Sequence, residues 1–273
     1  MTSSKNDKEQ PGTISEFGVQ WTSYTENSGY YASDEVLDTL FGNLLDKKTL
    51  RGKKIADVGA GSGRYTRLFH SLGATPILAL EPSAGFETLQ KNTADIPDIR
   101  LIKDTAENLP ADNFDWVFCI GVLQFIPDAD AALRAMGKAL GPDGKVFVWV
   151  YGRENNKLYL AFLTIFRAIS SKMSHREKEF MSRLLVYPAS FYGFLCKAIP
   201  LPMSDYLNGY FMKLNWYSRK LVVYDQLNPS MSKYYTREEL EELFSRCGFT
   251  NIEFYHRLNT SWSVSASYQN ETA

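Results

Sequence analysis

Short apolar segments alternate with segments of helical spacing from residue 53 to residue 150. The apolar runs predict five strands, at 54–58, 76–80, 100–103, 116–120 and 145–150. The segments between them predict helices at 65–71, 85–92 and 129–139. Because strands that alternate with helices are joined by right-handed crossovers, this order predicts a parallel sheet with its ligand sites at the carboxyl edge.

The alternation stops after the fifth predicted strand. Residues 152–233 are rich in aromatic residues and show no strand–helix alternation, which predicts a helical cap. Thr236 then predicts the start of a helix at 237–247. Segments 250–256 and 261–268 predict two strands that pair with each other. The fold class is therefore α/β: a doubly wound, mostly parallel seven-stranded sheet with a helical cap inserted after the fifth strand.

A glycine-rich turn follows the first predicted strand, in Asp57-Val58-Gly59-Ala60-Gly61-Ser62-Gly63. Glycine adopts positive φ without strain and lets a ligand approach the backbone, as in nucleotide-binding turns between a strand and a helix. A dinucleotide site needs a further glycine three residues after the second, and Arg64 stands there. The acid two residues before the first glycine favours a cationic or hydroxyl-bearing ligand. The turn therefore favours S-adenosylmethionine (SAM) over NAD.

Three further positions are expected at the same edge of the sheet. Glu81, followed by Pro82, ends the second predicted strand, where a carboxylate can accept from two ribose hydroxyls. Side-chain and backbone groups of the loop after the third strand can contact an adenine, although the same loop also reads as a capped turn. This loop contains Asp104, Thr105 and Ala106.

The end of the fourth predicted strand supplies an apolar wall at Ile120 and a close approach at Gly121. Gln124 follows it, either as a site residue or as a buried structural hydrogen-bonding group. Aromatic residues also gather before the first strand, between residues 17 and 31. They form either a lid that brings Gln20 and Trp21 to the ligand, with Tyr24 and Tyr30 near it, or a segment that packs on the edge of the sheet.

Together these residues resemble the class I, Rossmann-like SAM-dependent methyltransferases. The resemblance covers residues 53–150 and rests on the glycine turn, Glu81, Ala106-Glu107-Asn108-Leu109-Pro110, Phe114-Asp115 and Leu140-Gly141-Pro142-Asp143-Gly144. It implies that Asp57 and the backbone from Gly59 to Gly63, including Ala60 and Gly61, hold the methionine moiety. It also implies that Glu81 holds the ribose and that Thr105 and Ala106 lie at the adenine. S-adenosylhomocysteine (SAH) would be the product.

The patterns along the chain and the resemblance together predict five parts. They are a disordered arm (1–12), an N-terminal lid with helices (13–50), the SAM-binding core (51–151), an acceptor-recognition cap (152–233) and a closing helix with antiparallel strands (234–273). Segments 17–21 and 225–229 are similar to methyltransferases of bacterial sugar and surface-glycan pathways. This predicts O-methylation of a sugar or natural-product hydroxyl. The alternatives are a lipid-linked or quinone-like acceptor, and a SAM-binding interaction protein without turnover.

An acceptor hydroxyl must lose its proton, but the sequence identifies no base. The candidates flank or lie within the predicted cap: Tyr151, His175, Asp225 and Tyr235. No cysteine, histidine or carboxylate spacing typical of a metal site is present.

Composition limits the partners. The net charge of −1 gives no reason to expect a nucleic-acid partner. The resemblance implies a small-molecule acceptor. Three widely spaced cysteines and a polar start without an apolar signal segment predict a cytoplasmic protein. Most aromatic residues of the cap are expected to fill the cap's own core. For the apolar segments 158–169 and 191–199, a lipid contact, which is not favoured, and a homodimer interface are the alternatives.

Overall fold

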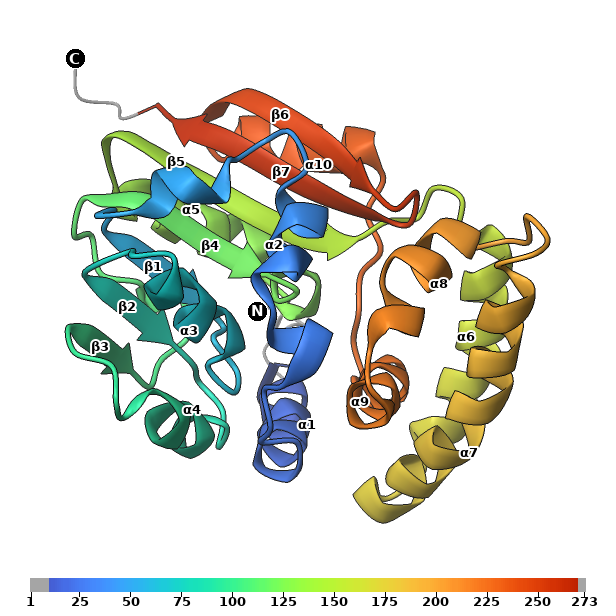
Figure 1. Ribbon diagram of the computed structural model, residues 1–273. Helices are drawn as coiled ribbons and strands as arrows, with labels where there is room; N and C mark the ends of the chain where they lie inside the picture. The colour runs from blue at the N-terminus through green and yellow to red at the C-terminus, as the bar shows by residue number, and fades with distance from the viewer. Residues whose placement is uncertain (1–9, 270–273) are drawn as a thin grey trace, which may run out of the picture.

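A seven-stranded sheet forms the centre of the molecule in the computed structural model, which describes residues 10–269 (Figure 1). Its spatial order is β3-β2-β1-β4-β5-β7-β6. Strands β1 to β5 pair in parallel, and β7 is antiparallel to both of its neighbours. The strands are β1 (Ile55–Val58), β2 (Ile77–Leu80), β3 (Ile99–Ile102), β4 (Phe114–Ile120), β5 (Leu140–Tyr151), β6 (Phe249–Arg257) and β7 (Ser261–Tyr268). The predicted fold class is confirmed.

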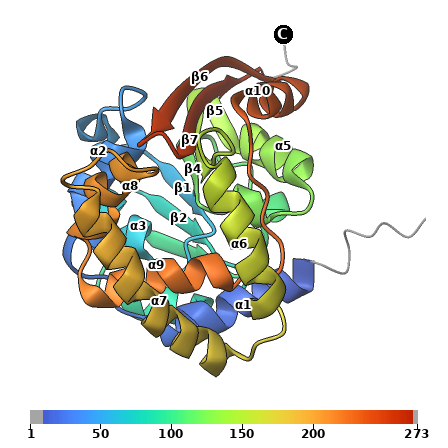
Figure 2. The ribbon, with the colours of Figure 1, turned by 90° about the vertical axis from the view of Figure 1, so that its right-hand side faces the viewer.

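Helices cover both faces of this sheet and build the cap. Those nearest the sheet are α2 (Asp34–Phe41), α3 (Arg64–Ser71), α4 (Phe86–Thr93), α5 (Ala129–Ala139) and α10 (Arg237–Arg246). Those near the carboxyl ends of the parallel strands or in the cap are α1 (Gln10–Ser23), α6 (Lys157–Ser170), α7 (His175–Leu195), α8 (Ser204–Gly209) and α9 (Trp216–Leu227). Figure 2 shows α6, α7 and α9 as the layer that lies in front of the sheet from that side.

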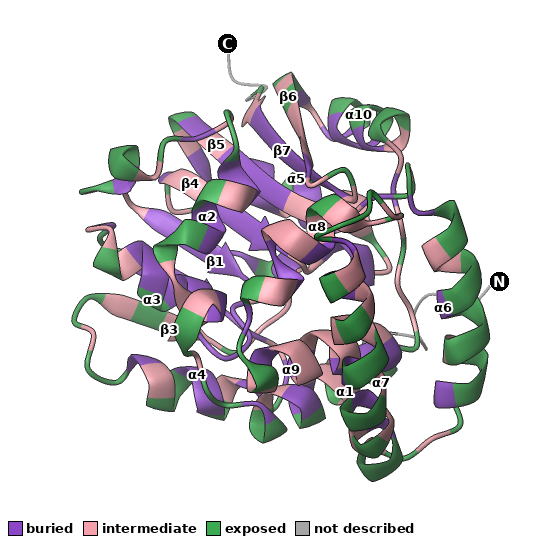
Figure 3. Cartoon of the chain, turned by 45° about the vertical axis from the view of Figure 1, so that its right-hand side comes forward, coloured by how far each residue is buried: buried purple, intermediate pink, exposed green. Residues whose placement is uncertain are grey.

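The core lies in two layers because successive side chains of a strand point to opposite faces. Phe118 of β4 faces α2 and α3, where its ring lies 4.3 Å from that of Phe69. Its neighbours Val117 and Cys119 face the other side, against α5 and α10. Burial on both faces accounts for the nearly continuous apolar sequence of β4 (Figure 3).

The cap leaves and rejoins the sheet at one place. Gly152 and Tyr235 form a β-bridge, and the Tyr235 N–H donates to the Tyr151 carbonyl at 3.0 Å. The Arg153 N–H donates in return to the Tyr235 carbonyl at 2.9 Å. The whole cap is therefore held at the carboxyl end of β5.

Several predicted boundaries differ from the observed ones, and one cap helix runs through a proline. Residues 10–12, predicted as disordered, form the first turn of α1, where Pro11 is tolerated because first-turn N–H groups need no intrahelical acceptor; residues 1–9 of the predicted arm lie outside the described part. Strand β5 begins at Leu140 and not at residue 145, because Leu140 pairs with Phe114. Helix α7 ends at Leu195 and continues through Pro188, so it includes only part of the apolar segment 191–199.

Candidate active site

Two adjoining cavities lie at the carboxyl edge of the sheet. The first, of about 130 Å³, lies among the ends of β1, β2 and β4. The second, of about 700 Å³, lies under the cap. Both are lined by a shared set of side chains: Phe17, Trp21, Tyr31, Arg64, Tyr65, Ile120 and the backbone of Gly121. A ligand in one cavity therefore adjoins a ligand in the other.

The glycine turn forms the floor of the first cavity. Gly59 and Gly61 have φ of +74° and +57°, a region that disfavours other residues. A Cβ on Gly59 would lie 2.5 Å from the Val122 side chain, and one on Gly61 would lie 2.9 Å from the Trp21 indole. A side chain at either position would therefore clash with Val122 or Trp21, and the turn from Gly59 to Gly61 lines the cavity.

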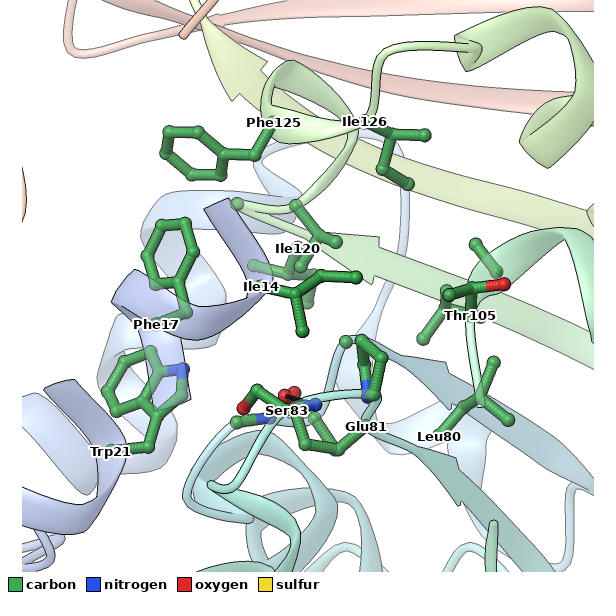
Figure 4. Close-up of a pocket in the computed structure, with 18 of the residues that line it drawn as sticks. Ile14, Phe17, Trp21, Leu80, Glu81, Ser83, Thr105, Ile120, Phe125 and Ile126 are labelled. Carbon is green, nitrogen blue, oxygen red and sulfur yellow. Dashed lines mark hydrogen bonds between the residues drawn. The ribbon is translucent and has the colours of Figure 1, made fainter. Parts of the chain in front are cut away.

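Glu81 connects this turn to the end of β2. Its carboxylate is buried and accepts from the Gly61 N–H at 2.9 Å and the Ser83 N–H at 3.0 Å. Each carboxylate oxygen has a second acceptor position, so the group retains capacity for ligand hydroxyls. Glu81 and Pro82 both line the first cavity. Figure 4 shows Glu81 beside Ser83 at the base of the cavity.

Helix α1 closes the cavity from the opposite side. Ile14, Phe17 and Trp21 point from α1 toward the strand ends (Figure 4). Phe17 lies 4.7 Å from Phe125, and the Trp21 carbonyl accepts from Thr88 at 3.0 Å. The helix is therefore fastened over the site.

The predicted lid residues divide between two environments. Trp21 lines both cavities, and Gln20 lines the second. Tyr24 instead packs on Tyr224, with ring centroids 5.3 Å apart. The Tyr30 hydroxyl donates to the Gly209 carbonyl. Neither Tyr24 nor Tyr30 is part of the lining of these two cavities.

The loop after β3 forms a further wall. Asp104, Thr105 and Ala106 all line the first cavity, and Figure 4 shows Thr105 facing Leu80. The Asn108 amide and the Thr105 N–H donate to Asp104 and lower the pKa of its carboxyl, so this group stays ionised. Together with Ile120 these side chains form a slot that is apolar on most sides.

Two residues of the predicted ligand set lie outside both linings. Asp57 is buried under the turn and accepts from the Thr66 hydroxyl at 2.6 Å. Burial raises the pKa of Asp57 to about 6, despite the opposing effect of that hydrogen bond. Gly63 faces Leu89 and Thr93 of α4. In this structure Asp57 therefore supports the turn by joining β1 to α3.

A polar cluster stands out in the second, mostly apolar cavity. The Tyr151 hydroxyl donates to Asp225 Oδ2 at 2.7 Å, and Gln20 Nε2 donates to Asp225 Oδ1 at 2.9 Å. Gln226 donates to the Tyr151 hydroxyl at 3.0 Å. Burial, followed by the nearby Asp225 carboxylate, raises the pKa of Tyr151 well above its usual value. Tyr151 is consequently a neutral donor and Asp225 the acceptor.

The other two candidate bases lie elsewhere. His175 Nδ1 is 2.6 Å from the Tyr224 hydroxyl, and Nε2 is 3.1 Å from the Ser23 hydroxyl. Tyr235 is 1% exposed in the core behind the sheet. Neither lines either cavity, so the structure brings together Tyr151 and Asp225 alone among the four candidates.

Arg64 is a cavity residue that was not predicted from the sequence, where it served only to exclude a dinucleotide site. Its guanidinium lies over the rings of Tyr31 and Tyr65, 3.8 and 4.0 Å from their centroids, and donates to the Tyr31 carbonyl. It lines both cavities. The signal available in the sequence was a cation directly after the third glycine. The structure adds that this cation lies where the two cavities meet.

Beyond the two cavities, residues 10–269 include the buried amide of Gln124 but no metal-binding cluster and no membrane-spanning helix. The buried Gln124 amide has no partner for its nitrogen or its oxygen and lies outside both linings. Within residues 10–269, no group of three or more histidine, cysteine or carboxylate side chains could hold a metal ion. In the same part of the chain, no helix combines the length and hydropathy needed to cross a membrane.

The chain is similar to known methyltransferases in sequence. Residues 56–148 match the methyltransferase domain family. A ubiquinone biosynthesis O-methyltransferase of Idiomarina loihiensis is 26% identical over 194 residues, which cover 66% of this chain and 79% of that protein.

Solved structures of low identity share the fold. One is a 1,6-didemethyltoxoflavin-N1-methyltransferase of Burkholderia thailandensis with bound SAH, at 13% identity and a TM-score of 0.55, covering 99% of this chain and 93% of that one. Another is a magnesium protoporphyrin IX methyltransferase of Synechocystis, also with SAH, at 12% identity and a TM-score of 0.55, covering 95% and 97%. The domain match and the methyltransferase relatives identify the protein as a SAM-dependent methyltransferase, and its seven-stranded sheet gives it the fold of these solved structures.

Proposed function

We propose that SAM binds in the first cavity and that the protein transfers its methyl group to a hydroxyl oxygen of a small molecule held in the second. The shared wall of the two cavities supports this assignment, because methyl transfer requires donor and acceptor to be adjacent. The observation that carries the proposal is the Tyr151–Asp225 pair in the second cavity.

The first cavity suits each part of the cofactor. The turn from Gly59 to Gly61 lines the space that we assign to the methionine portion, and the Glu81 carboxylate can accept from the ribose hydroxyls. Thr105 and Ala106 border the slot for the adenine. We assign the methionine carboxylate to Arg64, whose guanidinium has donors to spare. The bound cofactor supplies an activated methyl group.

Asp225 is proposed as the general base. An acceptor hydroxyl next to its carboxylate would pass its proton to an Asp225 oxygen. Tyr151 and Gln20 each donate to one oxygen of Asp225, which fixes the orientation of the carboxylate. Tyr151 and Gln20 thus act as positioning residues.

The second cavity favours a quinone-like phenol over a sugar as the acceptor. Apolar and aromatic side chains dominate its lining: Phe162, Phe166, Leu207, Phe211, Leu221 and Val222. A sugar would leave most of its hydroxyls without partners against such walls, which is costly. The Idiomarina relative named for ubiquinone biosynthesis supports the same acceptor class.

The test is a methyl-transfer assay of the purified protein with SAM, a panel of catechols and hydroquinones, and a matched panel of sugar nucleotides. We expect methylated product and stoichiometric SAH with phenols alone. Transfer to sugars alone, or methylation of nitrogen in an aminophenol of the panel, would overturn the acceptor assignment.

A further inference from the structure

Helix α6 exposes large apolar side chains along one side. Leu158, Phe162, Ile165 and Ile169 recur at intervals of three or four residues, Phe166 follows Ile165, and all five are 37–62% exposed. Residues with this spacing lie on one face of a helix. Figure 3 shows the outer side of α6 as mostly exposed.

Helix α7 carries a second stripe. Phe180, Leu184, Tyr187, Phe191 and Phe194 follow one another at intervals of four and three residues and are 48–65% exposed. These two stripes, here called the α6–α7 face, hold ten of the thirteen large apolar side chains that are exposed in the described part of the chain. Monomeric proteins rarely expose such a concentration without a partner.

The charge of this region differs from that of the whole chain. Residues 157–200 contain seven lysine and arginine residues and two carboxylates, for a net charge of 7 − 2 = +5, whereas the whole chain carries −1. The exposed cations are Lys157, Lys172, Arg176, Arg183 and Lys197. One carboxylate, Glu179, is already paired with Lys220 at 3.1 Å. The apolar face is therefore bordered by cations.

The second cavity opens onto this face. Leu158, Phe162 and Phe166 of α6 line the cavity and are at the same time exposed. Pro188 of α7 also lines the cavity and is exposed. An apolar path therefore leads from the surface between α6 and α7 to the Tyr151–Asp225 pair.

We propose that the α6–α7 face docks on an anionic lipid bilayer, so that an acceptor with a hydrocarbon tail enters the second cavity from the membrane. Apolar helix faces bordered by lysine and arginine bind at lipid interfaces, and cations near an anionic surface strengthen that binding. A symmetric contact between two copies would instead bring two +5 regions together, which is unfavourable. The substrate-delivery part of this inference rests on the proposed function, whereas the docking part does not.

Flotation of the full-length protein with two kinds of vesicle tests the docking. One kind is phosphatidylcholine alone, and the other contains equal parts of phosphatidylcholine and phosphatidylglycerol. The combined variant Ile165→Gln, Leu184→Gln, Phe191→Gln removes apolar residues that lie outside the cavity lining. Arg176→Gln with Lys197→Gln removes exposed cations. Val19→Gln, at an exposed apolar residue of α1, is the matched control.

We expect binding to the anionic vesicles, about tenfold weaker binding by both α6–α7 variants, and unchanged binding by Val19→Gln. SAH affinity and the methylation of a phenol without a tail should be unchanged in the variants, while methylation of a long-chain phenol in vesicles should fall. Absence of flotation in the wild type, or equal flotation of the variants, would overturn the docking. A wild-type dimer that the apolar variant converts to a monomer would assign the face to a second copy. Flotation without methylation of any phenol would count against the acceptor assignment alone.

Discussion

At the scale of single residues, two acids have different roles. The buried Asp57 supports the site, and the partly buried Asp225 is proposed to act in it. Asp57 is held by Thr66 under the glycine turn, away from both cavities. Asp225 lies in the second cavity, with its two oxygens held by different elements of the chain. The sequence singled out both acids, but the roles differ because burial and hydrogen bonding differ.

Asp57 predicts a pH dependence of stability. Its folded-state pKa of about 6 exceeds the ordinary value of 3.8, so the folded protein binds the proton more tightly than the unfolded chain does. The stability from this group is fully present below the unfolded value and is lost as the pH rises through about 6. Between pH 5 and 7.5 the loss is about 1.4 kcal/mol. Denaturant unfolding of wild type and Asp57→Asn checks this: the difference between their unfolding free energies should shift by that amount, and a constant difference would contradict it.

Asp225→Asn tests the proposed base. The amide keeps the shape of the side chain but cannot take a proton, so kcat should fall by about 10²-fold or more. The affinity for SAH should stay within about twofold of the wild type. The matched control is Asp205→Asn, at an exposed carboxylate of α8. A kcat close to that of the wild type would show that the proton leaves by another route.

At the scale of elements, α1 connects the two halves of the site. Its Trp21 covers the glycine turn, and its Gln20 reaches Asp225 of α9. Asn228, just after α9, donates to the Glu16 carbonyl and to Gln20, both at 3.0 Å. The helix is thus fixed to the cap and to the sheet at the same time.

Trp21→Ala should weaken SAH binding about tenfold, which is about 1.4 kcal/mol. The indole packs against Gly61 and Gly85, so its loss opens the first cavity to solvent. Trp216→Ala, which removes a 43% exposed indole from α9, is the control and should leave the affinity unchanged. Calorimetric titration of both variants checks this, and equal affinities would show that α1 does not close over the cofactor.

Local patterns predicted the elements well where a single rule decides them. Thr236 caps α10 by accepting from the Glu239 N–H, while the Glu239 side chain accepts from the Thr236 N–H. The predicted range 129–139 is that of α5. Helix α7 continues through Pro188, although a proline inside a helix removes one backbone hydrogen bond.

The site could be predicted only in part, because local sequence patterns do not contain contacts between residues that are far apart in the chain. Gly59, Gly61 and Glu81 follow from a local motif at strand ends, and they do line the first cavity. The contact between Gln20 and Asp225 joins residues 205 positions apart, so no local pattern contains it. Sequence spacing likewise gave no way to see that Asp57 turns toward α3.

At the scale of the whole molecule, the chain divides the work between two regions. The sheet and α1 enclose the first cavity, and the cap encloses most of the second. Gly152 and Tyr235 fasten both ends of the cap at one point. We therefore assign the cofactor to the first region and the acceptor to the second.

One calorimetric titration tests that division most directly: SAH into the wild type, Glu81→Ala and Asp225→Asn. Glu81 borders the first cavity and Asp225 the second. We predict saturable binding by the wild type, a loss of tenfold or more, about 1.4 kcal/mol, in Glu81→Ala, and a change within about twofold in Asp225→Asn. Unchanged binding by Glu81→Ala, or a comparable loss in Asp225→Asn, would contradict the assignment of the two cavities.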